Sequence, residues 1–116
     1  MTDATDLKGL WQGSYSYSSS AEIGETPFKA RFGGQGNTLS GLIMEVHFNT
    51  GDQVKAEIEG AIENDIVRFT KQYVGAGSEY KRVVHYEGRL SPDGGSISGT
   101  WSLPDDSGTF VMQRSV

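Results

Sequence analysis

The clearest feature of the sequence is a nearly regular alternation of apolar and polar side chains over residues 54–63. Valine, alanine, isoleucine, glycine and isoleucine occupy the even positions, whereas lysine and three glutamates occupy four of the five odd positions. Successive side chains of a β-strand point to opposite faces, so a period of two is typical of a strand with one buried and one solvated face. We therefore predict a half-buried strand here.

Seven further runs show the same period, and no segment has a helical apolar period of useful length. The eight predicted strands cover residues 7–18, 27–32, 38–48, 54–63, 66–74, 80–90, 96–103 and 108–114. Turn-forming residues fill the short links 33–37, 49–52, 63–65, 91–95 and 104–107. Hairpin-length links between consecutive strands indicate antiparallel neighbours, and hence a meander. We expect residues 1–6 to be a disordered tail and residues 7–116 to form a single domain.

Glycines on the predicted inner faces bear on whether the sheet closes. They are Gly13, Gly41, Gly60, Gly88 and Gly99. Glycine weakens a strand unless a sharp bend or a close backbone approach requires it. Closure also removes the two exposed edges of an open sheet. The fold class that we predict is all-β, an eight-stranded antiparallel up-and-down barrel, and the alternative is a flattened sandwich of the same strands.

Composition and charge exclude several kinds of site. The chain has 116 residues and no cysteine, and its net charge of −5 comes without a basic cluster. It can therefore form no disulfide and no thiolate metal site, and it is a poor candidate for binding nucleic acid or an anionic membrane. No run approaches the length of a membrane span. We expect a cytoplasmic protein with no cofactor and no metal.

Two elements near the chain ends carry a family resemblance. Gly9-Leu10-Trp11 opens the first predicted strand, and Arg114 lies at the end of the last. This pattern resembles the calycin group (lipocalins, fatty-acid-binding proteins and avidins), whose barrels pack a basic residue of the last strand across such a tryptophan. The resemblance implies that Gly9, Trp11 and Arg114 are structural and plug one end of the barrel. It does not extend to biotin binding, because Gly13 stands where avidins carry a hydrogen-bonding asparagine.

The third predicted strand can be placed in two registers. One points Leu39, Gly41, Ile43, Glu45 and His47 inward, and the other points Ser40, Leu42, Met44, Val46 and Phe48 inward. We favour the first, because it keeps a glycine at mid-strand as on the other inner faces. An exposed apolar stripe then runs along the outer wall, where we expect a homodimer contact. Its members are Leu42, Met44, Val46 and Phe48.

The inner faces are unusually polar in this register. The candidate ligand-binding residues are Tyr15, Tyr17, Glu45, Lys71, Arg82, Tyr86 and Trp101. A buried Glu45 needs Lys71 or Arg82 nearby, because an unpaired interior charge is costly. This set could form either a ligand cavity with a charged floor or a closed network of ion pairs and tyrosines without a cavity.

Three functions fit these residues. The first is a non-enzymatic barrel that binds a small, partly apolar ligand, which the inward Lys71, Arg82 and Arg114 would favour as an anion. The alternative is a structural or self-association module with a filled core. A small enzyme with Glu45 or His47 as the acid/base group is the third, with Tyr86 assisting. No catalytic residue is assigned. His47 and His85 lie on unrelated strands, so they predict no metal site.

Overall fold

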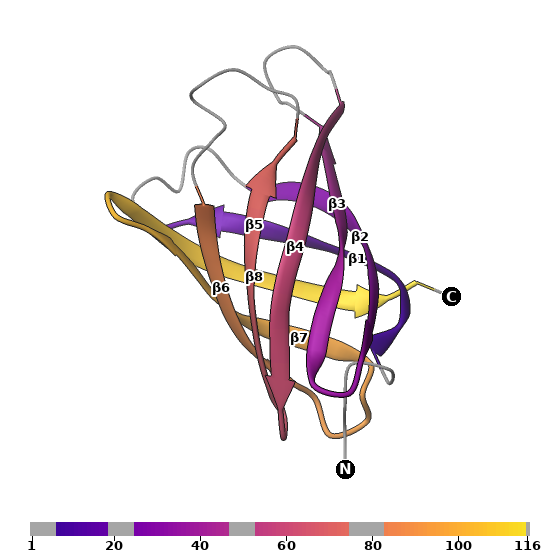
Figure 1. Cartoon of the computed structure of the whole chain (residues 1–116). Helices are drawn as coiled ribbons and strands as arrows, with labels where there is room; N and C mark the ends of the chain where they lie inside the picture. Colours follow the sequence, from indigo (N-terminus) through magenta and orange to yellow (C-terminus); the bar gives the residue numbers. More distant parts are fainter. Residues whose placement is uncertain (1–6, 19–24, 47–52, 75–82, 116) are drawn as a thin grey trace.

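Eight strands follow one another around a closed barrel in the computed structural model of the protein (Figure 1). They are β1 (Gly9–Tyr17), β2 (Glu25–Gln35), β3 (Thr38–Val46), β4 (Gln53–Glu63), β5 (Ile66–Tyr73), β6 (Val83–Leu90), β7 (Ser96–Leu103) and β8 (Asp106–Arg114). The structure describes residues 7–18, 25–46, 53–74 and 83–115. The predicted tail, His47, Phe48 and Arg82 lie outside these ranges.

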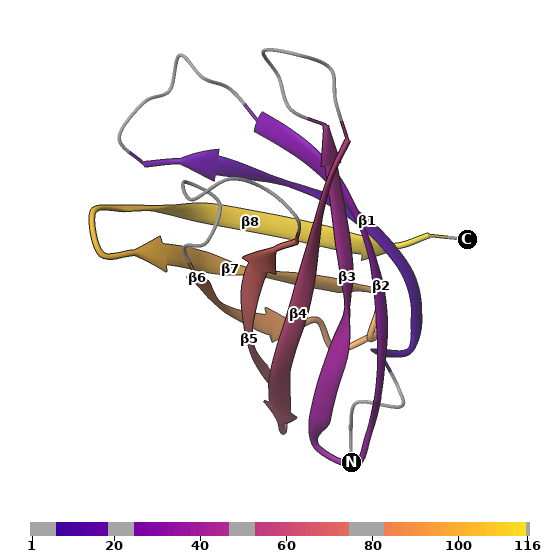
Figure 2. The ribbon, with the colours of Figure 1, turned by 45° about the horizontal axis from the view of Figure 1, so that its top comes forward.

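Closure is visible in the pairing of the first strand. β1 is antiparallel to β2, with Gly13 opposite Phe28, and antiparallel to β8, with Gly13 opposite Met112. Strands β2 to β7 each pair with their two neighbours in the sequence, and β8 pairs with β7 and β1. The predicted up-and-down barrel is therefore confirmed, and the sandwich alternative is wrong. In Figures 1 and 2, β3, β4 and β5 run steeply while β1 and β8 cross them at a large angle.

Close backbone contacts at the glycines explain how the sheet bends this sharply. A methyl group on Gly99 would collide with the carbonyl oxygen of Glu87 and lie 2.5 Å from the Cα of Gly88. A methyl group on Gly60 would likewise collide with the carbonyl of Arg68 and lie 2.5 Å from the Cα of Phe69. Only glycine lets neighbouring strands approach this closely. The glycines on the inner faces had predicted such close approaches.

The strands bury one face and expose the other, as their sequence period predicts. On β4, Ala56, Ile58 and Ile62 are buried, whereas Lys55 and Glu57 are exposed. The largest side chains that are fully buried include Trp11, Phe32, Leu39, Ile97 and Met112. No described helix is long and apolar enough to cross a membrane.

β3 adopts the favoured register. Leu39, Ile43 and Glu45 are buried inside, whereas Leu42 and Met44 each expose 39% of their surface on the outer wall. The opposite register is therefore wrong for these residues. The side chains of Val46 and Phe48, which complete the predicted stripe, lie outside the described set.

One predicted turn is largely a strand. Residues 33–37 were expected to form a glycine-rich turn, but β2 continues to Gln35 and only Gly36 and Asn37 form the turn. Gly36 has a φ of 58°, a left-handed conformation that glycine adopts readily. Gly33 and Gly34 instead pair with Ser40 and Leu39 of β3. These two glycines are in a strand because they pair with β3, and the local glycine-rich sequence does not show that pairing.

Candidate functional site

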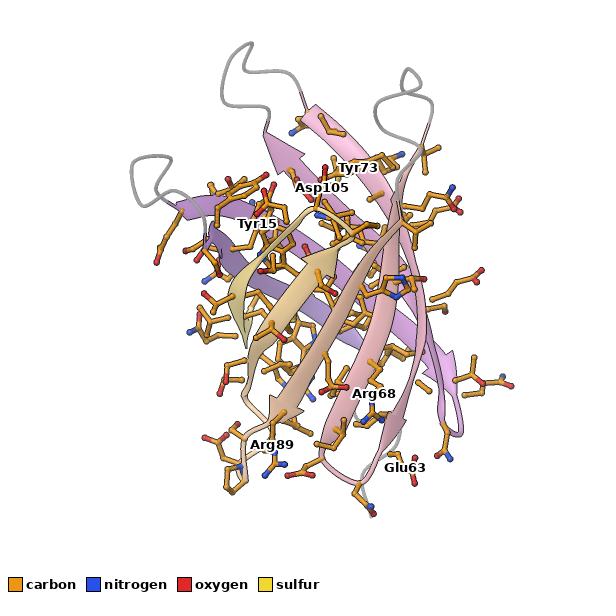
Figure 3. All side chains as sticks on the ribbon, turned by 90° about the vertical axis from the view of Figure 1, so that its left-hand side faces the viewer. Tyr15, Glu63, Arg68, Tyr73, Arg89 and Asp105 are labelled. Atoms are coloured by element: carbon orange, nitrogen blue, oxygen red, sulfur yellow. The ribbon has the colours of Figure 1, made fainter. Side chains whose placement is uncertain are left out.

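The two ends of the barrel carry different chemistry. The turns at 36–37, 64–65 and 91–95 lie at one end together with Trp11 and Arg114, and we call it the Trp11 end. Tyr17 and the 104–105 turn lie at the opposite end, which we call the Tyr17 end. Figure 3 shows Tyr15 and Tyr73 near the Tyr17 end.

A buried ion pair lies on the inner wall toward the Tyr17 end. The Nζ of Lys71 on β5 donates to Oε2 of Glu45 on β3, and the two atoms are 2.6 Å apart. Lys71 exposes 2% of its surface and Glu45 exposes 5%. The sequence predicted that either Lys71 or Arg82 lies beside a buried Glu45, and in the structure Lys71 does so. A pair this well buried needs further hydrogen bonds to offset the loss of hydration.

Two tyrosines provide those hydrogen bonds. The hydroxyls of Tyr15 and Tyr73 both donate to Oε1 of Glu45, at 2.8 and 2.9 Å. Both carboxylate oxygens are therefore engaged. Tyr73 was not among the predicted site residues, although it lies two positions after Lys71 and so shares its face of β5. This spacing of two residues could have identified Tyr73 as a member of the site.

Aromatic rings surround the ammonium group of Lys71. Its Nζ lies 4.8 Å from the ring centroid of Tyr15, 4.9 Å from that of Tyr73 and 5.2 Å from that of Tyr86. The negative faces of aromatic rings attract a cation at such distances. Burial nevertheless lowers the pKa of Lys71, and the opposing pull of Glu45 offsets this only in part.

Tyr17 and Trp101 lie beyond the ion pair, toward the rim. Their rings meet edge-on with centroids 5.0 Å apart, and Trp101 also meets Tyr15 at 6.0 Å. The indole N–H of Trp101 donates to the carbonyl of Ser16 at 3.1 Å. Gly108 lies between Tyr17 and Trp101 in the sheet register, and a methyl group there would come within 2.6 Å of the indole nitrogen. Glycine at this position thus makes room for the indole.

Tyr86 completes the cluster from β6. Its ring stacks on Phe69 at 4.8 Å and meets Phe110 edge-on at 5.1 Å. Its hydroxyl has no hydrogen-bond partner among the residues that the structure describes. In that same part of the chain, every fully buried polar side-chain atom has a partner. The Tyr86 oxygen must therefore reach space that water can enter, although the residue exposes only 3% of its surface.

All four tyrosines of this cluster resist ionisation. Burial is the largest cause of the raised pKa of Tyr15, Tyr17, Tyr73 and Tyr86, and the negative charge of Glu45 is the second. The tyrosines therefore remain hydrogen-bond donors in neutral solution.

Arg114 belongs to the Trp11 end. Its guanidinium carbon lies 4.7 Å from the ring centroid of Trp11, and its Nε donates to the carbonyl of Gly94 at 3.1 Å. The indole N–H of Trp11 donates to the carbonyl of Leu7 at 2.9 Å. Arg114 thus packs across Trp11 and caps a backbone carbonyl at this end of the barrel. Gly9, the third residue of the predicted plug, has a φ of 126° at the start of β1.

The structure brings together most of the predicted ligand-binding residues. Glu45, Lys71 and Tyr86 lie on the inner wall, with Tyr15, Tyr17 and Trp101 around them. Arg82 lies outside the described residues. Arg114 was expected to favour an anionic ligand, but it is placed at the other end of the barrel. The described residues contain no group of three or more side chains that could hold a metal ion.

Hollows lie on the outside of the barrel wall, and two of them extend over several strands. The first, of about 560 Å³, extends from β8 to β4, and its lining includes Gln12, Lys29, Met44 and Val111. The second, of about 590 Å³, extends from β4 to β7 and is more strongly charged. Its lining includes Glu59, Arg68, His85 and Glu87, and Arg68 and Glu87 form an exposed ion pair at 2.6 Å.

Comparison with known proteins shows the fold. No family model matches the chain, and no curated protein matches it in sequence. A solved structure described as a redesigned β-barrel is similar, with a TM-score of 0.80 and 16% identity over 97% of this chain and 95% of that chain. At this identity the likeness supports the eight-stranded barrel and nothing about a ligand.

Proposed function

We propose that the protein binds a small, partly apolar molecule inside the Tyr17 end of the barrel. The observation that carries this proposal is the gathering of Tyr15, Tyr17, Tyr86 and Trp101 around a buried ion pair. Ligand sites in proteins typically combine apolar and aromatic walls with a few placed polar groups. The Trp11 end offers no comparable site, because Arg114 and Trp11 are engaged with each other there.

The same geometry favours binding over proton transfer. Both oxygens of Glu45 accept hydrogen bonds, and Lys71 neutralises its charge. Three of the roughly four lone-pair sites of this carboxylate are then occupied, which leaves little of it available to take a proton from a substrate. His47, the other acid/base candidate, lies outside the described residues.

The charge of the ligand is a separate prediction. Lys71 is balanced by Glu45 and Arg114 lies at the other end, so the expectation of an anion now depends on Arg82. Titration with 2-naphthoate and with neutral 2-naphthalenemethanol tests this expectation. An anionic preference requires that 2-naphthoate bind more tightly.

Nuclear magnetic resonance tests the binding proposal itself, because the two tryptophans report on opposite ends. Either probe is expected to shift the indole N–H signal of Trp101 saturably and to leave that of Trp11 unchanged. Tyr17→Ala should weaken the response, whereas the control Leu10→Ala, on the outer wall, should not. Absence of a saturable shift at Trp101 with both probes would contradict the proposal.

A second candidate function is self-association through the outer wall of β3. Leu42 and Met44 are exposed there, which favours it. Their cross-strand neighbours are charged, however: Arg31 and Glu57 flank Leu42, and Lys29 and Lys55 flank Met44. Light scattering should show a homodimer that Met44→Glu dissociates. A monomer at all concentrations would contradict this candidate.

A further inference from the structure

Tyr86 differs from the other tyrosines in the way its hydroxyl is used. The hydroxyls of Tyr15 and Tyr73 donate hydrogen bonds to Glu45. Tyr86 has no acceptor among the described residues, although its ring is packed between Phe69 and Phe110 and almost completely buried. Because its oxygen reaches space that water can enter, water can accept this hydrogen bond, and a ligand oxygen that displaces the water can take its place.

The position of Tyr86 suggests what would use that donor. The ammonium of Lys71 lies 5.2 Å from the centroid of its ring, and Tyr86 is directly opposite Trp101 in the sheet register. The Tyr86 side chain thus lies beside the cluster where the proposed ligand would bind. The stacking on Phe69 holds the ring in place, so the donor is oriented before a ligand arrives.

We infer that the ligand carries an acceptor oxygen, such as a carbonyl, that receives a hydrogen bond from the Tyr86 hydroxyl inside the barrel. This inference rests on the proposed binding function and adds a chemical class to it. The acceptor enters first, and the apolar body of the ligand lies against Tyr17 and Trp101 nearer the rim. A site that holds a buried donor in place discriminates against analogues that lack the matching acceptor.

Two probes of the same shape separate this inference from the binding proposal. In 2-acetylnaphthalene a carbonyl is attached to the ring, whereas 2-ethylnaphthalene has a similar outline without oxygen. The wild-type protein should bind the ketone about three- to tenfold more tightly, which corresponds to one net hydrogen bond. Tyr86→Phe should remove that preference, which is measured as the ratio of the affinities for the two probes in each protein.

The possible outcomes are distinct. If neither probe binds, the proposed function fails and the inference fails with it. If both bind equally, or if Tyr86→Phe keeps the preference for the ketone, the inference is overturned while the binding function stands. Thermal unfolding provides a second readout. The midpoint of Tyr86→Phe should equal or exceed that of the wild type, and a clear decrease would show that the hydroxyl has a structural partner.

Discussion

The ammonium of Lys71 and the carboxylate of Glu45 are 2.6 Å apart and almost wholly excluded from water. The two residues are 26 positions apart in the sequence and lie on β3 and β5. They come together because each points inward from its strand and the strand between them, β4, contributes small and aliphatic side chains. The alternation of apolar and polar residues predicts that both side chains point into the barrel. That they touch depends on how β3, β4 and β5 pair, which the sequence pattern does not show.

The first prediction concerns the energy of this pair. Lys71→Met leaves the Glu45 carboxylate buried without its cation, so it should lower the free energy of unfolding by about 3–5 kcal/mol. The combined variant Glu45→Gln with Lys71→Met removes both charges and keeps an acceptor for Tyr15 and Tyr73. Its loss, measured by urea denaturation, should be well below the sum of the two single losses. Additive losses would show that the two groups are not coupled.

Tyrosine-to-phenylalanine variants test the hydrogen bonds to Glu45. Tyr15→Phe and Tyr73→Phe each remove a donor to a buried carboxylate, so each should reduce stability by about 1.5–3 kcal/mol. Tyr86→Phe is the matched control, because its hydroxyl has no described partner. Equal losses in all three variants, measured by denaturant titration, would refute this division of roles.

A third prediction concerns the Trp11 end. Arg114→Ala removes the stacking on Trp11 and the hydrogen bond to Gly94, and should reduce stability by about 1–3 kcal/mol. Arg68→Ala is the control, because its ion pair with Glu87 is more than half exposed and should be worth about 0–1 kcal/mol. If calorimetry gave the larger loss for Arg68→Ala, the structural role of Arg114 would be wrong.

Glycine substitutions test the bending of the sheet. Gly99→Ala forces a methyl group against the backbone of β6 and should cost about 1–3 kcal/mol or more. Gly33→Ala is the control within another strand, because a methyl group there meets only the Ser40 hydroxyl oxygen, at 3.9 Å. Thermal denaturation should separate the two variants clearly. Similar midpoints would mean that the close approach at Gly99 is not required.

Alkaline pH should destabilise the barrel through its tyrosines. In the unfolded chain a tyrosine ionises near pH 10, whereas the raised pKa values of Tyr15, Tyr73 and Tyr86 keep them protonated in the fold. Stability from these groups is therefore present below pH 10 and is lost as the pH rises above it. The lowered pKa of Lys71 acts in the opposite direction, but only up to about pH 10.5.

The measurement is an ultraviolet titration of phenolate absorbance, run together with circular dichroism. The buried tyrosines should ionise in one step that coincides with unfolding. Ionisation of all five tyrosines near pH 10 without loss of structure would contradict their burial.

The sequence predicted much of the fold, because a period of two and short links leave few arrangements of eight strands. The glycines on the inner faces favoured a closed barrel over a sandwich. Gly41, in the middle of β3, indicated which face of that strand points inward. The end of β2 was misread, because Gly33 and Gly34 look like turn residues until their partners on β3 are known. The role of Tyr73 was not predicted, and Arg114 was expected both to pack across Trp11 and to favour an anionic ligand, of which the structure shows only the first. Both point inward, but their height along the barrel and their partners depend on pairing between distant strands.

A crystal structure of the complex with 2-acetylnaphthalene tests the central claim most directly. We predict that the probe lies between Tyr17 and Trp101, with its carbonyl oxygen within hydrogen-bonding distance of the Tyr86 hydroxyl. A probe seated only in the outer hollow beside Met44 and Val111, with the Tyr17 end unoccupied, would contradict the claim that the interior is the binding site.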